Sequence, residues 1–402
     1  DVLTTYADLD ADALAIVYEL GADDGWRLVN LMQETGVEEP LNDILSYVDP
    51  KDGNTYVAGT TSEGVHLFRR DEGGAWTHRE LVSEIDGAVP FASGLAQLTS
   101  LQTIELADGS GGTIEIDSFT PDGQEGVPTV HFLGIDEDSR LRLFWQDGTV
   151  DQEGNYGWAH LDLSNDLFSN TQDAPVFTGR VETYVTSWGG LNFAGLDASG
   201  ELWSVWYSPS LTWENNGNTN HWHASNLSEI TGAPELSGAV SVYLTSWSGI
   251  NIAGISPGGE LVVTWWVPSF GSEWVQTNFS QEFGGPSLAT ESLSTYVTPW
   301  GGLNVVGVDA TGDLNVYWWV PSEPGTWNIS NLTSGFDAEV ARPSGELTTI
   351  ITPVGYNRDQ EVLNSETSIL GHDSETGDVI RAFWEPSFGG TWMLENVTEL
   401  AT

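Results

Sequence analysis

TYVTSWGGLNFAGLDASGELWSVWYSPS (residues 183–210) recurs almost residue for residue at 242–269 and 295–322. The later copies read VYLTSWSGINIAGISPGGELVVTWWVPS and TYVTPWGGLNVVGVDATGDLNVYWWVPS. A tryptophan holds the same place in each copy, at Trp188, Trp247 and Trp300, with spacings of 59 and 53 residues. Repetition at this period indicates a fold built from one supersecondary unit per repeat.

A weaker signature extends over the whole chain of 402 residues. It consists of a tryptophan, a polar residue four positions later and an apolar residue five positions later. Its seven tryptophans are Trp26, Trp76, Trp158, Trp222, Trp274, Trp327 and Trp392. Seven occurrences predict seven structural units.

A glycine in a short apolar segment marks the same units a second time. It precedes an aromatic residue by about a dozen positions, at Gly59, Gly134, Gly195, Gly254, Gly307 and Gly371. Ala7 takes the corresponding place in the first unit. The two markers agree on the register of the repeat, which chance would rarely produce.

The unit around Val242 shows what each repeat builds. Residues 242–245 and 250–255 are short runs of strong β-formers, and Ser-Pro-Gly-Gly at 256–259 closes a hairpin. Third and fourth strands are expected at 261–267 and 274–279. Both faces of the third strand carry large apolar groups, which requires packing neighbours on both sides of the sheet. Four antiparallel strands in 50 to 60 residues are typical of one propeller blade.

We therefore predict an all-β fold, a seven-bladed β-propeller with four-stranded antiparallel blades. A single domain spans 1–402, with blades at about 1–38, 39–87, 88–172, 173–232, 233–285, 286–337 and 338–402. The first blade is incomplete, because 2–8, 14–20 and 26–31 read as its second, third and fourth strands. Either the ring closes on three strands or the missing strand comes from other sequence. The start lacks both a Met and a signal peptide, so we expect a piece of a larger chain or assembly.

The segment SWGGLNFAGLDASGELWSVWY, followed by a Trp and an Asn-Leu ending, resembles the repeats of tectonin-type and PLL-like bacterial propeller lectins. Similar repeats are also found in large bacterial surface proteins. The resemblance is close over about 175–336 and fades toward the N-terminus. It implies a propeller of six or seven blades that binds sugars such as fucose or methylated saccharides.

Acidic residues dominate the charge, because 59 Asp and Glu against 11 Lys and Arg give a formal net charge of −48. Such a chain repels phosphate backbones and anionic headgroups, so no nucleic acid partner is expected. No apolar run of 18 residues occurs, so no membrane insertion is expected. The charge either keeps the protein soluble in a salty medium or binds calcium. We expect an extracellular or cell-surface location.

The repeated turn supplies the candidate glycan-binding residues. Tryptophans in turns can stack on the apolar face of a sugar, and an asparagine follows each of them as a polar partner. The candidates are Trp188, Trp247, Trp300, Asn192, Asn251 and Asn304. Each set has a structural alternative, because the Trp residues can fill gaps between blades and the Asn residues can cap turns.

Asp8, Asp10 and Asp12 have the spacing that begins a calcium-binding loop. No glycine follows them, so the EF-hand pattern is not met, and an Asp-rich hairpin turn is the alternative. Ca²⁺ is the one cofactor that the sequence suggests.

The sequence contains no Ser-His-Asp, P-loop or His-Glu-x-x-His motif. A propeller glycosidase needs two carboxylates facing each other, and the expected innermost segments, such as 184–186 and 243–245, carry none. We therefore expect no enzymatic activity. The main hypothesis is a structural or adhesive module of a surface assembly, with glycans or other surface proteins as partners. The alternatives are a multivalent carbohydrate-binding lectin and a glycan-processing propeller enzyme.

Overall fold

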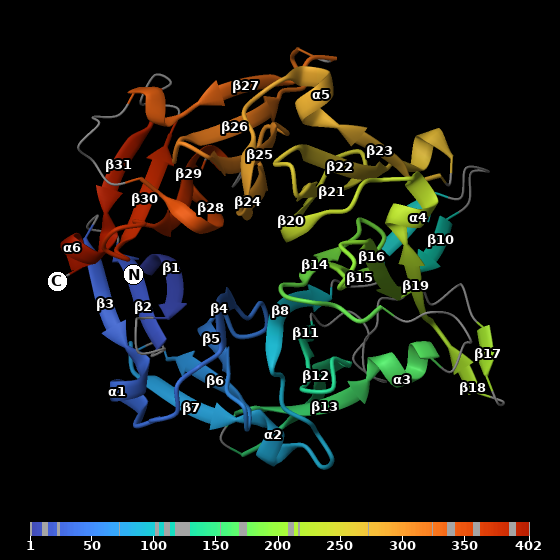
Figure 1. Cartoon of the computed structure of the whole chain (residues 1–402). Helices are drawn as coiled ribbons and strands as arrows, with labels where there is room; N and C mark the ends of the chain where they lie inside the picture. The colour runs from blue at the N-terminus through green and yellow to red at the C-terminus, as the bar shows by residue number, and fades with distance from the viewer. Residues whose placement is uncertain are drawn as a thin grey trace. The chain divides into compact units, whose positions relative to one another are not determined.

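The computed structural model describes residues 2–9, 15–21, 25–71, 73–100, 104–107, 113–116, 129–152, 154–168, 175–207, 213–215, 218–271, 273–323, 325–335, 342–356, 362–385 and 391–401. Antiparallel sheets make a seven-bladed β-propeller that is nearly all β (Figure 1). The first blade has three strands and the other six have four each. The predicted fold class is confirmed, including the incomplete first blade.

Contacts divide the chain into two compact units. The first unit comprises 1–4, 18–28 and 227–402, and the second comprises 5–17 and 29–226. The three strands of the first blade contribute residues to both units; they are β1 (Val2–Leu9), β2 (Ala15–Gly21) and β3 (Trp26–Asn30).

The first unit contains the fifth, sixth and seventh blades, and in each blade the strands pair in chain order. The fifth consists of β20 (Ser237–Leu244), β21 (Ile250–Ile255), β22 (Leu261–Trp266) and β23 (Val275–Asn278). The sixth consists of β24 (Leu288–Val297), β25 (Leu303–Asp309), β26 (Leu314–Trp319) and β27 (Asn328–Asn331). The seventh consists of β28 (Ser344–Tyr356), β29 (Val362–His372), β30 (Val379–Trp384) and β31 (Met393–Asn396). Short helices are α4 (Leu227–Thr231), η1 (Pro268–Phe270), α5 (Phe279–Phe283), η2 (Thr333–Gly335) and α6 (Val397–Ala401).

The second unit contains the second, third and fourth blades. The second consists of β4 (Asp43–Val48), β5 (Thr55–Thr60), β6 (Val65–Arg70) and β7 (Trp76–Glu80). The third consists of β8 (Ser93–Ser100), β11 (Thr129–Ile135), β12 (Leu141–Val150) and β13 (Tyr156–Asp162). The fourth consists of β14 (Glu182–Val185), β15 (Leu191–Leu196), β16 (Leu202–Tyr207) and β19 (Trp222–Asn226). The unit also contains two small hairpins, β9 (Ile104–Ala107) with β10 (Thr113–Ile116) and β17 (Trp213–Asn215) with β18 (Asn218–Asn220). Its short helices are α1 (Leu31–Thr35), α2 (Leu81–Glu84) and α3 (Leu163–Phe168).

The repeated tryptophan signature marks the junction between the outer strand of each blade and a short helical turn. The polar residue four positions after the Trp caps that turn, because its side chain accepts a hydrogen bond from a backbone N–H two or three residues later. Such caps are formed by Asn30, Glu80, Asp162, Asn278, Asn331 and Asn396. The apolar residue that follows begins the helix in six of the blades. The fourth strand expected at 274–279 is therefore shorter, since Phe279 already belongs to α5.

The same cap ties the outer strand to the hairpin that precedes the third strand. In the fourth blade, Asn226 donates its side-chain amide to Glu201 at 2.7 Å. The fifth, sixth and seventh blades repeat the contact with Asn278 and Glu260, Asn331 and Asp313, and Asn396 and Asp378. In the third blade the hairpin residue is basic and the cap is acidic, because Arg140 pairs with Asp162 at 2.8 Å.

The marker glycine of the second strand lies beneath an apolar side chain from the innermost strand of its blade or from the segment just before that strand. A Cβ added to Gly134 would lie 2.1 Å from Cγ of Phe91, which is fully buried. The other five glycines meet Leu41, Phe177, Leu236, Leu288 and Leu347 in the same way. At Gly134 close packing excludes a Cβ, since it would overlap the Phe91 ring, whereas at the other five glycines a Cβ would crowd its neighbour at 2.5–3.0 Å.

Blades bury both faces of their central strands. Leu261, Val262 and Val263 follow one another on β22, so their side chains alternate between faces, and each is at most 1% exposed. Val263 packs with Leu303 and Val305 of the next blade in one apolar cluster. Burial on both faces is what the sequence of the third strand predicts.

The seventh blade contacts strands of the first blade within the first unit. The indole Nε1 of Trp26 donates to Oε1 of Glu395 at 2.8 Å, and the Tyr18 hydroxyl lies 3.2 Å from Oγ1 of Thr398. The guanidinium of Arg381 lies 5.5 Å from the centre of the Trp26 ring. The last blade therefore packs directly on the strands that begin the chain.

Among the described helices, none has both the length and the apolar composition that a bilayer crossing requires.

We expect Gly134→Ala to lower the melting temperature clearly, because the new methyl group overlaps the buried ring of Phe91. Overpacking of this kind costs about 1–3 kcal/mol. Gly258→Ala is the matched control, since a Cβ there meets only Oγ of Ser256 at 3.6 Å. Thermal melts followed by circular dichroism check this, and equal melting temperatures for the two variants would contradict the packing role of the glycine.

Candidate functional site

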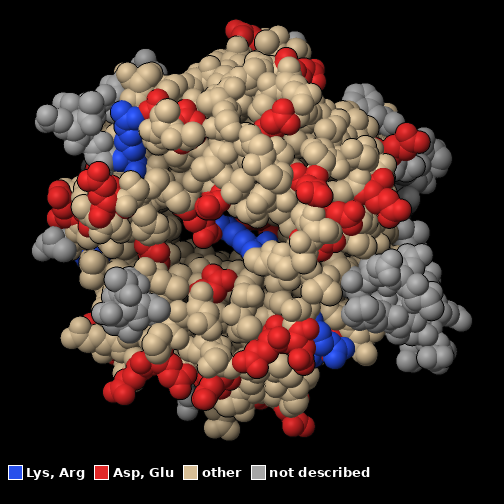
Figure 2. Space-filling view, in the orientation of Figure 1, with Lys and Arg blue, Asp and Glu red and all other residues tan. Residues whose placement is uncertain are grey.

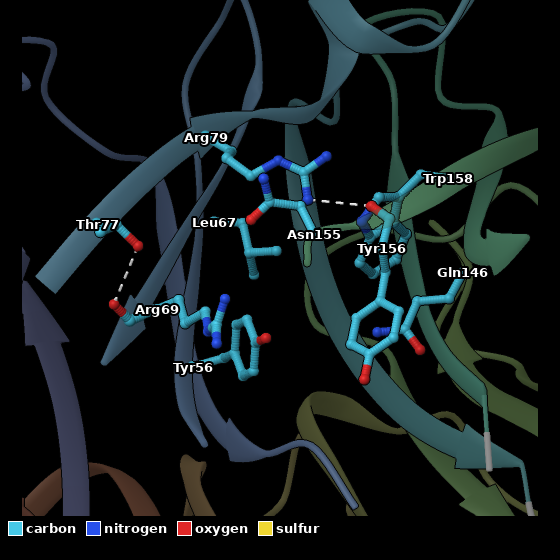
Figure 3. Close-up of a pocket in the computed structure, with 9 residues that line it drawn as sticks. All are labelled: Tyr56, Leu67, Arg69, Thr77, Arg79, Gln146, Asn155, Tyr156 and Trp158. Carbon is cyan, nitrogen blue, oxygen red and sulfur yellow. Dashed lines mark hydrogen bonds between the residues drawn. The ribbon is translucent and has the colours of Figure 1, made fainter. Parts of the chain in front are cut away.

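A cavity lies between the second and third blades, inside the second unit (Figure 3). The cavity is small: its volume is about 20 Å³, which is room for about one water molecule. The second blade lines it with Tyr56, Leu67, Arg69, Thr77 and Arg79, and the third blade with Gln146, Asn155, Tyr156 and Trp158. Three aromatic rings and several hydrogen-bonding side chains therefore meet in one place.

Strand register shows why the cavity forms at this pair of blades. Arg69 of β6 pairs with Tyr56 of β5, and the residues at this register in the fourth, fifth and sixth blades are Trp206, Trp265 and Trp318. Each of these indoles donates to a hydroxyl on the outer strand of its own blade, namely that of Ser225, Thr277 or Ser330.

In the second blade, arginines replace both members of this indole–hydroxyl pair. Arg69 stands where the fourth to sixth blades have Trp, and Arg79 stands where they have Ser or Thr. A planar guanidinium fills less volume than an indole and presents several N–H donors. The exchange therefore replaces an apolar contact with a polar wall.

The two arginines differ in how far the protein satisfies them. Arg79 pairs with Glu84 and donates to the backbone carbonyl of Tyr156 at 3.0 Å, which ties the two blades together across the cavity (Figure 3). Arg69 has one ion pair among the described residues, with Asp52 at 4.0 Å. That carboxylate also accepts hydrogen bonds from the Tyr56 hydroxyl and the backbone N–H of Asn54, each at 2.8 Å.

Lys51, the single lysine of the chain, lies at the border of the cavity. Its ammonium donates to Oε1 of Gln146 at 2.8 Å and lies 4.9 Å from the centre of the Tyr156 ring. Nε2 of Gln146 donates in turn to the fully buried Asp49 at 2.7 Å. Burial raises the pKa of Asp49 and lowers the pKa of Lys51. The amide of Gln146 thus binds Lys51 through its oxygen and Asp49 through its nitrogen, and it lies between these two charged side chains.

Two donors of the cavity wall are buried without an acceptor among the described residues. They are Nε of Arg69 and Nε1 of Trp158. A buried donor without a partner costs about 1–3 kcal/mol, and such atoms mark places where a ligand or water supplies the missing acceptor.

The tryptophans predicted from the repeat lie outside this cavity. Trp247 and Trp300 are 44% and 46% exposed, and Trp188 is half-buried. Trp247 meets Trp319 of the following blade edge to face at 5.4 Å, and Trp300 meets Trp384 of its following blade at 6.0 Å. Both combine exposure with packing between blades.

The predicted polar partners of these tryptophans bind backbone in the turn itself. Asn192 donates to the carbonyl of Gly190 at 2.8 Å, and Asn304 donates to that of Gly302 at 3.2 Å. Asn251 donates to the carbonyl of Tyr243 at 3.4 Å. Asn192 and Asn304 are also buried, so the structure uses these amides to hold the inner hairpin.

The predicted calcium-binding residues fall partly outside the described residues, because Asp10 and Asp12 are not among them. Asp8 lies on β1, where its carboxylate accepts the backbone N–H of Leu9 at 2.9 Å. Within the ranges given above, no three acidic or histidine side chains converge as metal ligands.

Several innermost strands carry a carboxylate near their start, so the prediction that they lack one is wrong. They include Asp43 of β4, Glu182 of β14, Glu291 of β24 and Glu346 of β28. The expected segments began too late in the strand to include them. Asp43 accepts the backbone N–H of Leu95 at 2.8 Å, and Glu182 pairs with Arg180 at 3.0 Å.

Known structures share this fold across almost the whole chain. A lectin from Burkholderia pseudomallei superposes with a TM-score of 0.53 at 13% identity, covering 98% of both chains. A variant of the Aleuria aurantia lectin in complex with Fucalpha1-6GlcNAc gives 0.50 at 12% identity, covering 90% of this chain and 96% of that one. Both are lectins. No protein-family model and no curated protein matches the sequence, and the likeness to tectonin-type and PLL-like repeats stays a prediction.

Sequence reasoning missed the cavity, although a signal for it exists. Aligned by the Gly and Trp markers, the repeats place aromatic residues at the register of Arg69 in the third to seventh blades, as Trp145, Trp206, Trp265, Trp318 and Phe383. An arginine at a position that is otherwise aromatic, in a chain with 11 basic residues, indicates a local change of role.

A buried histidine on β11 of the third blade gives stability a pH dependence. His131 is fully buried, Nδ1 lies 3.0 Å from the carbonyl of Thr129, and burial lowers the pKa of His131 to about 3. The unfolded chain protonates this imidazole below about pH 6.5 while the folded protein does not. The stability that His131 contributes is therefore present above pH 6.5 and lost as the pH falls from 6.5 toward 3.

Between pH 7 and pH 5, we expect the free energy of unfolding of the parent protein to fall by about 2 kcal/mol more than that of His131→Asn. Asparagine is the residue at this register in the fourth to sixth blades. Urea denaturation at both pH values measures the difference, with the half-buried His223→Asn as control. The same loss in parent and variant would show that His131 does not cause it.

Proposed function

We propose that this protein binds carbohydrate at the surface over the small cavity between its second and third blades and works as a lectin. The observation that carries the proposal is the local replacement of an indole–hydroxyl pair by Arg69 and Arg79, which opens a polar and aromatic cavity there. Tyr56, Tyr156 and Trp158 offer ring faces to the apolar side of a sugar. The arginines and Trp158 offer hydrogen-bond donors to its oxygens.

The comparisons support a binding function of this kind. The two similar structures named above are lectins with the same fold, one of them in complex with a fucosylated disaccharide. They favour the lectin alternative from the sequence over the structural or adhesive module. They also favour binding over catalysis, so we propose a non-enzymatic role.

The exposed tryptophans form a second set of proposed contacts. Trp247 and Trp300 each lie edge to face against a tryptophan of the next blade and remain 44% and 46% exposed. Such platforms bind a single sugar weakly, and several on one rigid ring bind a branched or repeated glycan through their effective concentration.

The proposed working place is outside the cell or at its surface. Figure 2 shows carboxylates spread over the visible face with few basic groups between them. A surface of one dominant charge prevents self-association and stays soluble where salt shortens the range of its repulsion. Glycans of a surface or matrix are the proposed partners.

We expect Tyr156→Ala to weaken glycan binding at least tenfold, because it removes a ring face and the partner of Lys51 at the cavity. The measurement is a glycan array followed by calorimetry on the best ligand. Arg180→Gln, which changes an exposed ion pair in the fourth blade, is the control and should bind like the parent protein. No binding to any glycan by the intact parent protein would refute the lectin function.

We expect Trp247→Ala combined with Trp300→Ala to leave the affinity for a single short glycan unchanged and to lower binding to densely glycosylated surfaces several-fold. The physical reason is that these indoles lie outside the cavity and act by adding weak contacts. Surface plasmon resonance at low and high ligand density separates the two effects. An equal loss at both densities would mean that the tryptophans belong to the main site.

A further inference from the structure

Another cavity lies beside the second blade, inside the second unit. Its volume is about 580 Å³, a size typical of small-molecule sites. One side is formed by the end of α1 and the residues after it, Thr35, Gly36, Val37, Glu38 and Glu39. The other side is formed by the second blade, with Glu63 and Gly64 between β5 and β6, His66 on β6, and His78 and Glu80 on β7. We call this cavity the acidic groove.

The lining of the acidic groove does not balance its own negative charge. Four of its residues are glutamates, and none of its described residues is a Lys or an Arg. The Glu80 carboxylate is engaged, because its two oxygens accept backbone N–H groups at the start of α2 at 2.7 and 2.8 Å. Glu38 and Glu63 are exposed, and the Glu39 carboxylate lies 3.9 Å from Nε2 of His66. Three carboxylates are therefore left without a Lys or Arg partner among the described residues.

Two histidines of the groove form a pair that stays uncharged at neutral pH. The rings of His66 and His78 stack with their centres 5.0 Å apart, and Nδ1 of His66 lies 2.8 Å from Nε2 of His78. Burial lowers the pKa of His66, and it lowers the pKa of His78 to about 4. The pair therefore does not neutralise the glutamates that surround it.

Hydrogen bonds assign the proton of each imidazole. The Thr61 hydroxyl accepts the backbone N–H groups of Glu63 and Gly64 at 3.2 and 3.0 Å. Because a hydroxyl has two acceptor sites and one proton, it donates to Nε2 of His66 at 3.2 Å. The proton of neutral His66 then lies on Nδ1 and is donated to Nε2 of His78, so that His78 carries its own proton on Nδ1. The lining thus offers one N–H donor at His78 next to its carboxylates.

From this charge pattern we infer that the acidic groove binds the ammonium group of a small organic ligand. An ammonium has three donors and no acceptor, so it suits unpaired carboxylates, and imidazoles that stay neutral do not repel it. The volume far exceeds that of a single ion, and within the described residues no three side chains converge as metal ligands. The inference goes beyond the proposed function, because the groove shares no residue with the cavity between the second and third blades.

An amino sugar and a polyamine are two sources of this chemistry. Both bring ammonium groups to the carboxylates, and an amino sugar also brings hydroxyl oxygens that accept from Nδ1 of His78. The net charge of −48 attracts every cation at long range. At physiological salt this attraction decays over about 8 Å, so the contacts inside the groove decide between ligands.

The test measures binding to the whole chain by calorimetry at pH 6 and 0.15 M salt, where amines and glutamates are both charged. The ligands are a glucosamine trisaccharide, its N-acetylated counterpart and spermidine, which has the same three amines as the first. We expect the stronger of the two amines to bind at least about tenfold more tightly than the N-acetylated sugar. The reason is that acetylation removes the positive charge and two of the three N–H donors of each amine. Tighter binding of the trisaccharide identifies an amino sugar as the source, and tighter binding of spermidine identifies a polyamine.

The double variant Glu39→Gln with Glu63→Gln keeps the shape of the groove and removes two of its charges. It should weaken binding of the stronger amine about fivefold or more, the sum expected for two exposed ion pairs. The matched control is Glu137→Gln with Glu375→Gln, which removes two equally exposed charges from hairpins outside the groove. It should bind like the parent protein, and thermal melts show that both double variants are folded.

Several outcomes would overturn the inference. Absence of binding by both amines rejects it, as does binding of the N-acetylated sugar as tight as that of the stronger amine. An equal loss in the two double variants would mean that the amines follow the general charge of the surface. Loss of amine binding in Tyr156→Ala would place the ligand at the other cavity. The proposed lectin site is tested separately by its own variants and glycans, so either proposal can fail alone.

Discussion

An apolar side chain lying on a strand glycine is the contact on which each complete blade depends. The segment before the innermost strand has to cross the sheet closely, and in the third blade the Phe91 ring takes the space that a Cβ at Gly134 would fill. The ring of Phe91 lies directly against the backbone of the second strand at Gly134 and covers that face of the strand. The sheet can then be buried on both faces, as β22 shows with three consecutive buried residues. Because all six contacts of this type repeat, the packing of blades is set by local sequence.

Repetition made the fold predictable from sequence. The end of the outer strand was less predictable, because the repeat pattern alone does not separate strand residues from the helix cap that follows them. The seven tryptophans and six glycines recur in the sequence, so their register could be read directly. In the structure the tryptophans are not equally packed, because Trp26, Trp76, Trp158 and Trp222 are buried while the other three are only partly buried. The residues after the tryptophan were assigned to a strand, although an Asn before Leu also suits a helix cap. In the structure, Asn278 ends β23 and caps α5. Phe279 is a β-former, so the local sequence does not show that the strand ends before it. The burial of its ring in the folded protein favours the helix that begins there.

The candidate site could not be predicted in the same way, because it consists of departures from the repeat. The residues that recur after each turn tryptophan, such as Asn192 and Asn304, hold the backbone of their own hairpin. Arg69 and Arg79 recur nowhere else at their registers in the described four-stranded blades. The fourth to sixth blades show the ordinary arrangement at these registers, in which an indole donates to a hydroxyl of the outer strand. In the second blade, two arginines stand in the place of that pair. Only the strand pairing shows that these two side chains share a face and meet Tyr156 of the next blade.

The exchange of Glu–Asn for Arg140–Asp162 in the third blade restricts how such a chain can evolve. For repeats that arose by duplication, the two positions had to change in a particular order. Changing Asn to Asp first sets a carboxylate against the hairpin carboxylate. In the fourth blade, Asn226→Asp would put a negative charge beside Glu201, to which the Asn226 amide now donates at 2.7 Å.

Changing the hairpin residue to Arg first leaves Asn able to accept from the guanidinium, and Asp then strengthens the pair to the 2.8 Å contact seen between Arg140 and Asp162. The same asymmetry limits recombination, since an outer strand moved from the third blade to the fourth carries its carboxylate into a place that already holds one. The pairing at this position thus distinguishes the third blade from the fourth to seventh blades, which share one acid–Asn contact.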